Sequence, residues 1–298
     1  MEIAVTGASG FIGTALVAAL RSEGHRVRAL VRRPAAGPDE VRWDPAEGTI
    51  DTAGLAGVHG IVNLAGEGIA EKRWTAEQKR RILESRTQAT GLIARTAATL
   101  DPKPHVLLSA SGIDFYGDRG DEELTESSGR GHGFLADVVV AWEGAAAPTV
   151  EAGIRTAFLR SGIVQSPAGG SLARQLPLFK FGIGGRLGTG DQWWSWISLD
   201  DEVGAIAHLL QHDVAGPVNL TAPTPVTNAE FTRTLGEVLH RPTLLPTPSF
   251  GPRLLLGREL AATLLYESKR VLPAKLVESG YRFRHPTLEA AFRDLLDR

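Results

Sequence analysis

Short apolar segments alternate with amphipathic helical patterns through the first two thirds of the chain. Apolar runs of strand length fall at residues 3–5, 27–31, 60–64, 105–108 and 154–159, and later at 193–197 and 218–220. Between the third and fourth runs, Thr75 and Gln78 have the spacing of a capping box and predict a helix that continues to about Leu100. This alternation predicts an α/β fold with a doubly wound parallel sheet that is covered by helices on both faces.

The pattern changes in the last third of the chain. Residues 167–190 are rich in glycine and interrupt the alternation, so we interpret them as an excursion from the sheet towards a substrate pocket. After Pro223, helical patterns at 228–239, 252–265 and 288–296 are punctuated by proline. We therefore predict a sheet domain from residues 1–165 and 193–222, and a small, mostly helical C-terminal substrate lobe from residues 166–192 and 223–298.

The first apolar strand runs directly into a turn rich in glycine. Gly7 allows the chain to turn sharply, Gly10 lets backbone amides approach a phosphate, and Gly13 lets the following helix pack closely on the sheet. The N-terminus of that helix adds amide donors and the positive end of its dipole. With a strand before it and a helix after it, this motif predicts a pyrophosphate site for a dinucleotide, formed by Gly7, Ser9, Gly10, Phe11, Ile12 and Gly13.

The end of the second strand indicates which dinucleotide is bound. An acidic residue there would accept hydrogen bonds from the ribose hydroxyls of NAD, but this chain has Arg32 and Arg33 after Val31. A guanidinium group pairs well with a ribose 2′-phosphate. We therefore predict NADP(H) as the cofactor, and the alternative is a solvated arginine pair at the end of a strand.

Composition narrows the classes of partner. The chain has 298 residues and a formal net charge of -2, and its charges are interspersed, so it offers no basic field for nucleic acid and no polybasic face for a membrane. It has no cysteine, which excludes disulfides and thiolate catalysis. No apolar run reaches the roughly 20 residues of a membrane span. Because the first core strand follows Met1 and Glu2 at once, we expect a cytoplasmic protein. We expect it to be a monomer or a homodimer.

We predict no metal site. His208 and His212 stand four residues apart on one predicted helix, but no carboxylate accompanies them on that face and the chain has no HExxH pattern. The expected ligands are instead the cofactor and a small-molecule substrate.

Small and hydroxylated residues follow the third and fourth strands. Ala65 and Gly66 would let the sugars of the cofactor lie against the backbone. Ser109, Ser111 and Tyr116 bring hydroxyl groups to the carboxyl edge of the sheet, where ligands bind in open α/β folds. Serines in such places often satisfy backbone groups instead, so the preceding glycine motif carries the functional interpretation.

These motifs together resemble the extended short-chain dehydrogenase/reductase superfamily. Further matches resemble its atypical branch, which is NAD(P)-dependent, epimerase/dehydratase-like and carries a C-terminal domain of unknown function. The resemblance extends over the whole chain, and it implies a Rossmann fold with bound NADP(H), a small substrate lobe and a label of nucleotide-sugar epimerase. The residues that carry it are Thr6 to Gly13, Asn63 to Ile69, Arg73-Trp74, Ser111, Tyr116-Gly117, Trp142-Glu143, Arg160 to Val164, Phe181 to Gly190, Gln192, Trp196-Ile197, Asp200-Asp201 and Asn228 to Phe231.

One departure from the superfamily concerns its catalytic residues. A tyrosine and a lysine four residues later usually share one helix face, where the lysine holds the nicotinamide ribose and lowers the pKa of the tyrosine. Counted from Trp142-Glu143, this pair falls on Leu135 and Val139, which cannot exchange protons. We take Tyr116 as the first substitute acid, ahead of Asp114 and His132, and Ser111 as the group that hydrogen-bonds the substrate oxygen.

The loops at the end of the fifth strand would complete the site. Backbone amides of Ser161, Gly162, Ile163 and Val164 lie where they could bind the nicotinamide carboxamide. We predict that Arg186, Gln192 and Trp196 face the substrate. Arg186 would pair with an anionic group and an aromatic plane would suit a sugar, whereas the alternatives are a solvated arginine and a core tryptophan.

Two hypotheses of function follow. The first is an NADP(H)-dependent oxidoreductase or epimerase-like enzyme that acts on a small carbonyl or carbinol substrate with a non-standard proton donor. Anionic and sugar-like compounds are the candidate substrates. The second is a catalytically silent module that binds NADP(H) and regulates or scaffolds a partner. The glycine motif supports both of them, because it predicts the cofactor and not the reaction.

Overall fold

The structure is a computed structural model that describes residues 1–298 apart from 244, 245, 249, 297 and 298, all of which belong to the predicted C-terminal lobe. Its central feature is an eight-stranded sheet in the order β12-β8-β6-β5-β1-β2-β3-β4. Neighbouring strands from β12 to β3 are parallel, and β4 pairs antiparallel with β3. The strands are β1 (Glu2–Thr6), β2 (Arg26–Val31), β3 (Glu40–Asp44), β4 (Thr49–Ile50), β5 (Gly60–Asn63), β6 (Val106–Gly112), β8 (Arg155–Ser161) and β12 (Gly216–Leu220).

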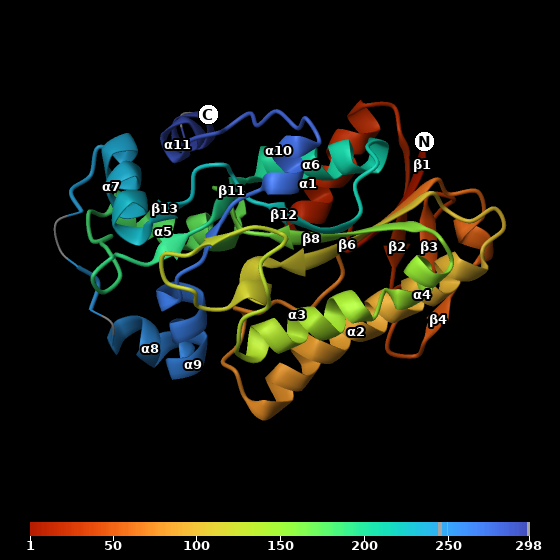
Figure 1. Cartoon of the computed structure of the whole chain (residues 1–298), viewed down its shortest axis with the longest axis horizontal. Coiled ribbons are helices and arrows are strands. Elements are labelled where there is room, and N and C mark those ends of the chain that lie inside the picture. The colour runs from red at the N-terminus through yellow and green to blue at the C-terminus, as the bar shows by residue number, and fades with distance from the viewer. Residues whose placement is uncertain (244–245, 249, 297–298) are drawn as a thin grey trace.

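Helices cover both faces of this sheet (Figure 1). On one face lie α1 (Phe11–Ser22), α6 (Leu199–Gln211) and α10 (Ala274–Glu278), which share a buried cluster with the strands. On the other face lie α2 (Ala76–Thr99), α3 (Phe134–Gly144) and α4 (Ala147–Glu151). The side chain of Thr75 accepts a hydrogen bond from the Gln78 amide, as the capping pattern predicts. The predicted doubly wound Rossmann-like sheet is therefore confirmed.

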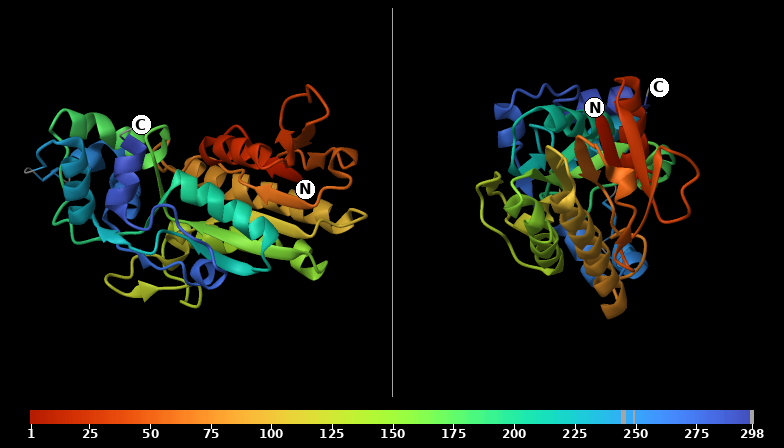
Figure 2. Two further views of the ribbon diagram at one scale, coloured as in Figure 1. Left: turned by 90° about the horizontal axis from the view of Figure 1, so that it is seen from above. Right: turned by 90° about the vertical axis from the view of Figure 1, so that its right-hand side faces the viewer.

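A group of helices lies beyond the carboxyl ends of the strands (Figure 2). It has a buried core of its own, which includes Leu172, Phe231 and Phe292 together with Trp194 and Trp196. The last two residues come from the segment assigned to the sheet domain, so side chains from both predicted units build this core. Its elements include α5 (Gly170–Lys180), β10 (Trp193–Trp194), β13 (Val226–Thr227), α7 (Asn228–Leu239), α8 (Phe250–Leu256), α9 (Arg258–Ala261) and α11 (Leu288–Leu296).

Three predicted elements differ in the structure. The single helix predicted at 252–265 is divided into α8, α9 and the π-helix η3 (Ala262–Tyr266), with Gly257 at a φ of 89° between α8 and α9. The strand predicted at 193–197 is interrupted at Ser195, whose hydroxyl group donates to the Lys269 carbonyl at 2.7 Å, and continues as β11 (Trp196–Ser198). The glycine-rich excursion contains the helix α5.

Several short elements have no counterpart among the predicted ones. They are β3, β4, β7 (Glu123–Leu124), β9 (Ile163–Ser166), β14 (Arg270–Val271), η1 (Ala53–Leu55) and η2 (Ile113–Tyr116). Most are too short for apolar periodicity to show itself. No helix within the described residues has the length and apolarity needed to cross a membrane.

Candidate functional site

The turn between β1 and α1 has the geometry of a phosphate cradle. Gly7 has a φ of +63°, and a Cβ there would lie 2.8 Å from the Leu64 carbonyl oxygen. A Cβ on Gly13 would lie 2.1 Å from the Gly7 carbonyl oxygen, so a side chain cannot fit at that position. Gly10 is the N-cap residue of helix α1. No side chain caps this end of the helix, and its first turn has no acidic residue. Its free amides are open to an anion, and the turn fits the pyrophosphate of a dinucleotide.

Thr6 ties this cradle to the loop that follows β5. Its hydroxyl group donates to Asn63 Oδ1 at 2.7 Å and accepts from the amides of Leu64 at 3.0 Å and Ala65 at 3.1 Å. Asn63 in turn donates to Ser109 Oγ at 3.3 Å, and Ser109 is buried. Ser109, which we predict to contact the cofactor, thus belongs to the buried network beneath the cradle.

A groove of about 1180 Å³ runs from the cradle over the ends of β2 and β5. It is lined by predicted cofactor residues, namely Gly7, Ser9, Gly10, Arg32, Arg33, Ala65 and Gly66. In the sheet, β1 lies between β5 and β2 and runs parallel to both. Two more members of the predicted set, Phe11 and Ile12, are half-buried in the first turn of α1, and the Phe11 ring lies against Gly169 and Gly170.

The two arginines at the end of β2 differ in their environments. Arg33 Nη1 donates to Glu40 Oε2 at 2.7 Å, and this pairing lowers the pKa of Glu40 to about 2. Arg32 has no hydrogen-bond or ion-pair partner among the residues that the structure describes. Arg32 is therefore the guanidinium that is available to a phosphate in the groove.

The segment after β8 does not offer the amides that the sequence predicts for the nicotinamide. The Gly162 amide donates to the Leu220 carbonyl at 3.0 Å, and the Ile163 amide donates to the Ser195 carbonyl at 2.9 Å. The Ser161 hydroxyl donates to Glu202 Oε1 at 2.5 Å. These donors are therefore already engaged. The Gly162 amide binds the end of β12, and the Ile163 amide binds the residue before β11, with which β9 pairs in parallel.

Ser111 and Tyr116 belong to one hydrogen-bonded network. The Ser111 hydroxyl donates to Glu143 Oε1 at 2.7 Å, and Glu143 forms an ion pair with Arg160 at 2.8 Å. Arg160 Nη1 donates to the Tyr116 hydroxyl at 3.1 Å, and that hydroxyl donates to Asn219 Oδ1 at 2.8 Å.

Tyr116 is poorly placed to act as the substitute acid. Its side chain is 0% exposed, and burial raises its pKa even though Arg160 opposes the shift. Its hydroxyl already has two protein partners. This placement argues against our prediction for Tyr116 and supports the alternative of a packed tyrosine.

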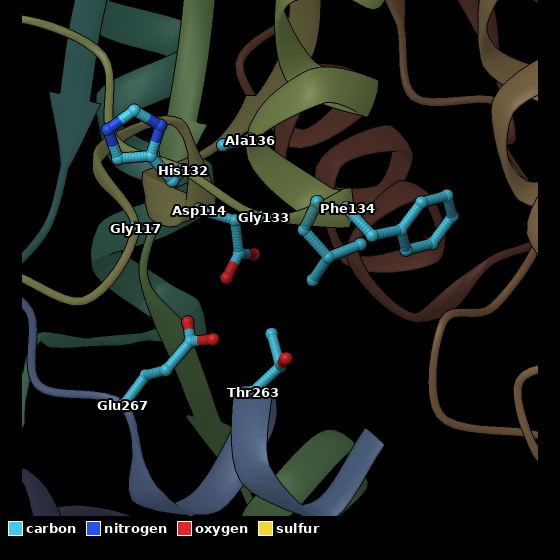
Figure 3. Close-up of a pocket in the computed structure, with 9 residues that line it drawn as sticks. Asp114, Gly117, His132, Gly133, Phe134, Ala136, Thr263 and Glu267 are labelled. Carbon is cyan, nitrogen blue, oxygen red and sulfur yellow. The ribbon is translucent and has the colours of Figure 1, made fainter. Parts of the chain in front are cut away.

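A small pocket opens at the carboxyl end of β6 (Figure 3). Leu135, which occupies the position of the missing tyrosine, lines it. In Figure 3 the carboxylates of Asp114 and Glu267 point into the pocket from the β6 side and from the C-terminal segment, and Thr263 faces them. The remaining lining residues are Gly117, His132, Gly133, Phe134 and Ala136.

Lys269 holds the two carboxylates of this pocket. Its ammonium nitrogen lies 3.1 Å from Asp114 Oδ1 and 2.7 Å from Glu267 Oε2, and its side chain is 8% exposed. Burial lowers the pKa of Lys269, but Asp114 and Glu267 outweigh that effect and raise the pKa above its ordinary value. Lys269 therefore stays charged. No motif in the sequence predicts a role for Lys269 or Glu267, because both come from a distant segment.

The three predicted substrate residues lie elsewhere. Trp196 is fully buried and its indole nitrogen donates to the Thr224 carbonyl at 2.9 Å, which makes it a core residue. Gln192 Nε2 donates to the Leu265 carbonyl at 2.9 Å and so fixes a loop. Arg186 is exposed, and its Nη1 lies 3.4 Å from the Thr189 carbonyl oxygen. The pocket beside Leu135, as the described residues form it, includes none of the three.

Comparisons with known proteins agree with this geometry. A family model described as NAD dependent epimerase/dehydratase family matches residues 3–221, and a domain of unknown function matches residues 247–295. An epimerase family protein of Mycobacterium tuberculosis is 43% identical over 290 residues, which cover 97% of this chain and 95% of that protein.

Two solved structures are similar in both sequence and fold. The crystal structure of human epimerase family protein SDR39U1 with NADPH has a TM-score of 0.90 and 33% identity, with 100% of each chain covered. A nucleoside-diphosphate sugar epimerase from Corynebacterium glutamicum has a TM-score of 0.82 and 36% identity, and the match covers 99% of this chain and 58% of that one. The resemblance drawn from the sequence motifs is thereby confirmed.

Proposed function

The chain belongs to the NAD dependent epimerase/dehydratase family, and from this premise we propose that it binds NADP(H) and oxidises or reduces a small carbonyl or carbinol compound. The observation that carries the proposal is the groove that joins an uncapped helix N-terminus to the unpaired guanidinium of Arg32. NADP(H) supplies or accepts a hydride at its nicotinamide ring when it is bound. The human relative crystallised with NADPH supports this choice of cofactor.

The substrate side of the proposal is the pocket beside Leu135. Asp114 is the group to which we assign the substrate proton, because one carboxylate oxygen is bonded to Lys269 while the carboxylate faces the pocket. Asp114 would take the proton of a carbinol as hydride leaves its carbon, and would return a proton to the oxygen in the reverse direction. The Ser111 hydroxyl donates a hydrogen bond to Glu143 Oε1, so its oxygen keeps only acceptor capacity for a substrate hydroxyl, and Ser111 itself is not among the described residues that line the pocket.

A second candidate function is a catalytically silent module that binds NADP(H). It is favoured by Leu135 and Val139, which are both buried and apolar where the superfamily has its tyrosine and lysine. It is also favoured by Tyr116, whose buried hydroxyl is hydrogen-bonded to Asn219 and Arg160. A panel of carbonyl compounds, tested for NADPH oxidation with wild-type protein and with Asp114→Asn, separates the two: turnover that Asp114→Asn abolishes supports the enzyme.

The cofactor assignment is tested by comparing two neighbouring arginines. Arg32→Ala should weaken NADPH binding about tenfold to a hundredfold, since a hydrogen bond to a charged group contributes about 1.5–3 kcal/mol, and should leave NADH binding unchanged. Arg33→Ala is the matched control, because Arg33 is already paired with Glu40. Titration calorimetry with both nucleotides gives the answer. Equal affinity of wild type and Arg32→Ala for NADPH would remove Arg32 from the site.

A further inference from the structure

Arg86 lies close to Gly66, which lines the cofactor groove, and to Trp142 on α3. It extends from α2, and a Cβ on Gly66, a residue of the groove, would lie 3.3 Å from its guanidinium carbon. The same guanidinium carbon lies 4.9 Å from the centroid of the Trp142 ring on α3. Trp142 follows Val139 by three residues, which places both on one face of that helix. The guanidinium therefore lies near the helix turn that carries the absent lysine.

The charge of Arg86 has no counter-ion in the described part of the protein. Its Nη1 donates to the carbonyls of Glu67 at 2.9 Å and Ile82 at 3.0 Å, so both of its contacts are neutral. Burial lowers the pKa of Arg86 to about 10, whereas the carboxylates of Asp114 and Glu67 act in the opposite direction. Arg86 is thus still a cation at neutral pH, and holding a half-buried cation without a counter-ion is costly.

We propose that Arg86 binds the nicotinamide half of NADP(H) by donating hydrogen bonds to its ribose hydroxyls. Arg86, on α2, would thus replace the lysine that the superfamily uses at the position of Val139 on α3. A guanidinium has five N–H donors. Nη1 donates to the Glu67 carbonyl of the loop and to the Ile82 carbonyl of α2, which leaves Nε and Nη2 for the ribose. This inference rests on the proposed binding of NADP(H). It makes Arg86 a cofactor-binding residue that places the nicotinamide beside Asp114.

The nicotinamide half is favoured over the pyrophosphate by position. The pyrophosphate cradle lies at the β1-α1 turn, whereas Gly66 follows β5, on the side of β1 that leads to β6 and the pocket. The negative charge of Asp114, which lines that pocket, opposes the effect of burial on the pKa of Arg86. A competing reading is that Arg86 only clamps the loop at Glu67 onto α2 through its Nη1 contacts.

Two nucleotides separate these readings. NADPH carries both halves of the cofactor, and 2′,5′-ADP carries the adenine half alone. Arg86→Met in the full-length protein should lower the affinity for NADPH about tenfold or more and leave the affinity for 2′,5′-ADP unchanged. Arg86→Lys, which retains a cation, should restore most of the NADPH affinity. Arg80→Met is the matched control, because Arg80 lies on the same helix in an exposed pair with Glu84. The Arg80→Met protein should bind both nucleotides as wild type does.

Each other outcome overturns the inference. Equal losses for the two nucleotides would make Arg86 a loop clamp, and an unchanged NADPH affinity would free it from any role in binding. If Arg86→Met does not fold, Arg86→Gln decides in the same way, because it keeps loop donors and removes the charge. Wild-type protein that binds neither nucleotide would overturn the proposed function as well, which distinguishes that failure from a failure of Arg86 alone.

Discussion

The cofactor groove and the pocket beside Leu135 are built in different ways, although they lie at the same edge of the sheet. The groove is made largely of backbone: two glycines that exclude any side chain, an uncapped helix end and one free guanidinium. The pocket is made of charged side chains from distant parts of the chain, with Asp114 after β6 and Glu267 and Lys269 from the C-terminal segment. A backbone-built site leaves a local pattern in the sequence, whereas a side-chain-built site leaves none.

The two regions should also differ in what they contribute to stability. The groove is open, and its residues bind a ligand that is not part of the chain. The pocket cluster joins the sheet to the C-terminal segment through a buried charge, so it should be needed for the fold itself.

The largest expected effect comes from Lys269→Met. Removing the ammonium leaves the carboxylates of Asp114 and Glu267 facing each other without compensation, which should cost about 3–5 kcal/mol of the free energy of unfolding. Urea denaturation measures this loss. Lys79→Met is the matched control, because Lys79 also reaches the C-terminal segment, through Glu259, but in an exposed pair that should contribute less than about 1 kcal/mol. Equal losses in the two variants would show that the buried cluster has no special role.

Gly13→Ala should have the next largest effect, and it acts on the groove. A Cβ placed 2.1 Å from the Gly7 carbonyl oxygen forces the cradle apart, at a cost of about 3 kcal/mol, and it should abolish measurable NADPH binding. Thermal unfolding and calorimetric titration of NADPH test the two parts separately. Gly144→Ala is the control: no atom lies within 4 Å of a Cβ at Gly144, so it should leave both measurements close to wild type. NADPH binding that survives in Gly13→Ala would contradict the cradle.

Sequence patterns predicted the parts of this protein that depend on local periodicity or on backbone conformation. Helix α7 and helix α11 begin and end where predicted, and the glycine cradle has the expected close contacts. The failures have one physical cause. Ser109, Gly162 and Ile163 were read as groups that face a ligand, but neighbouring strands and loops consume their donors and acceptors.

The substrate side was harder to predict for a related reason. Trp196 carries the same aromatic pattern whether it packs in a core or lines a pocket, and only the third dimension shows that α5, α7 and α11 enclose it. Lys269 lies 155 positions after Asp114 in the sequence, and no spacing rule joins residues so far apart. The sequence shows that positions 135 and 139 have no tyrosine and no lysine. It does not show that Asp114 and Glu267 lie in the pocket beside Leu135.

The smallest of the expected effects comes from a residue that lines neither region as the structure describes them: Glu202 on α6, which accepts a hydrogen bond from the Ser161 hydroxyl at the end of β8. Burial raises the pKa of Glu202 to about 8, although Ser161 opposes the shift. The folded protein therefore keeps a proton that the unfolded chain loses above the ordinary pKa of 4.5. This contribution to stability is complete below pH 4.5 and is lost as the pH rises towards 8.

Glu202→Gln should remove this loss, because glutamine does not titrate. Between pH 6 and pH 8, wild type should lose about 2 kcal/mol of unfolding free energy that the variant keeps, because each pH unit in this range corresponds to about 1.4 kcal/mol. Urea denaturation at several pH values measures the slope, and Glu237→Gln, which alters an exposed pair with Arg233, should follow wild type. A slope that is the same in Glu202→Gln and wild type would mean that Glu202 is ionised in the folded protein. The hydroxyl of Ser161 would then donate to a buried carboxylate that carries a negative charge.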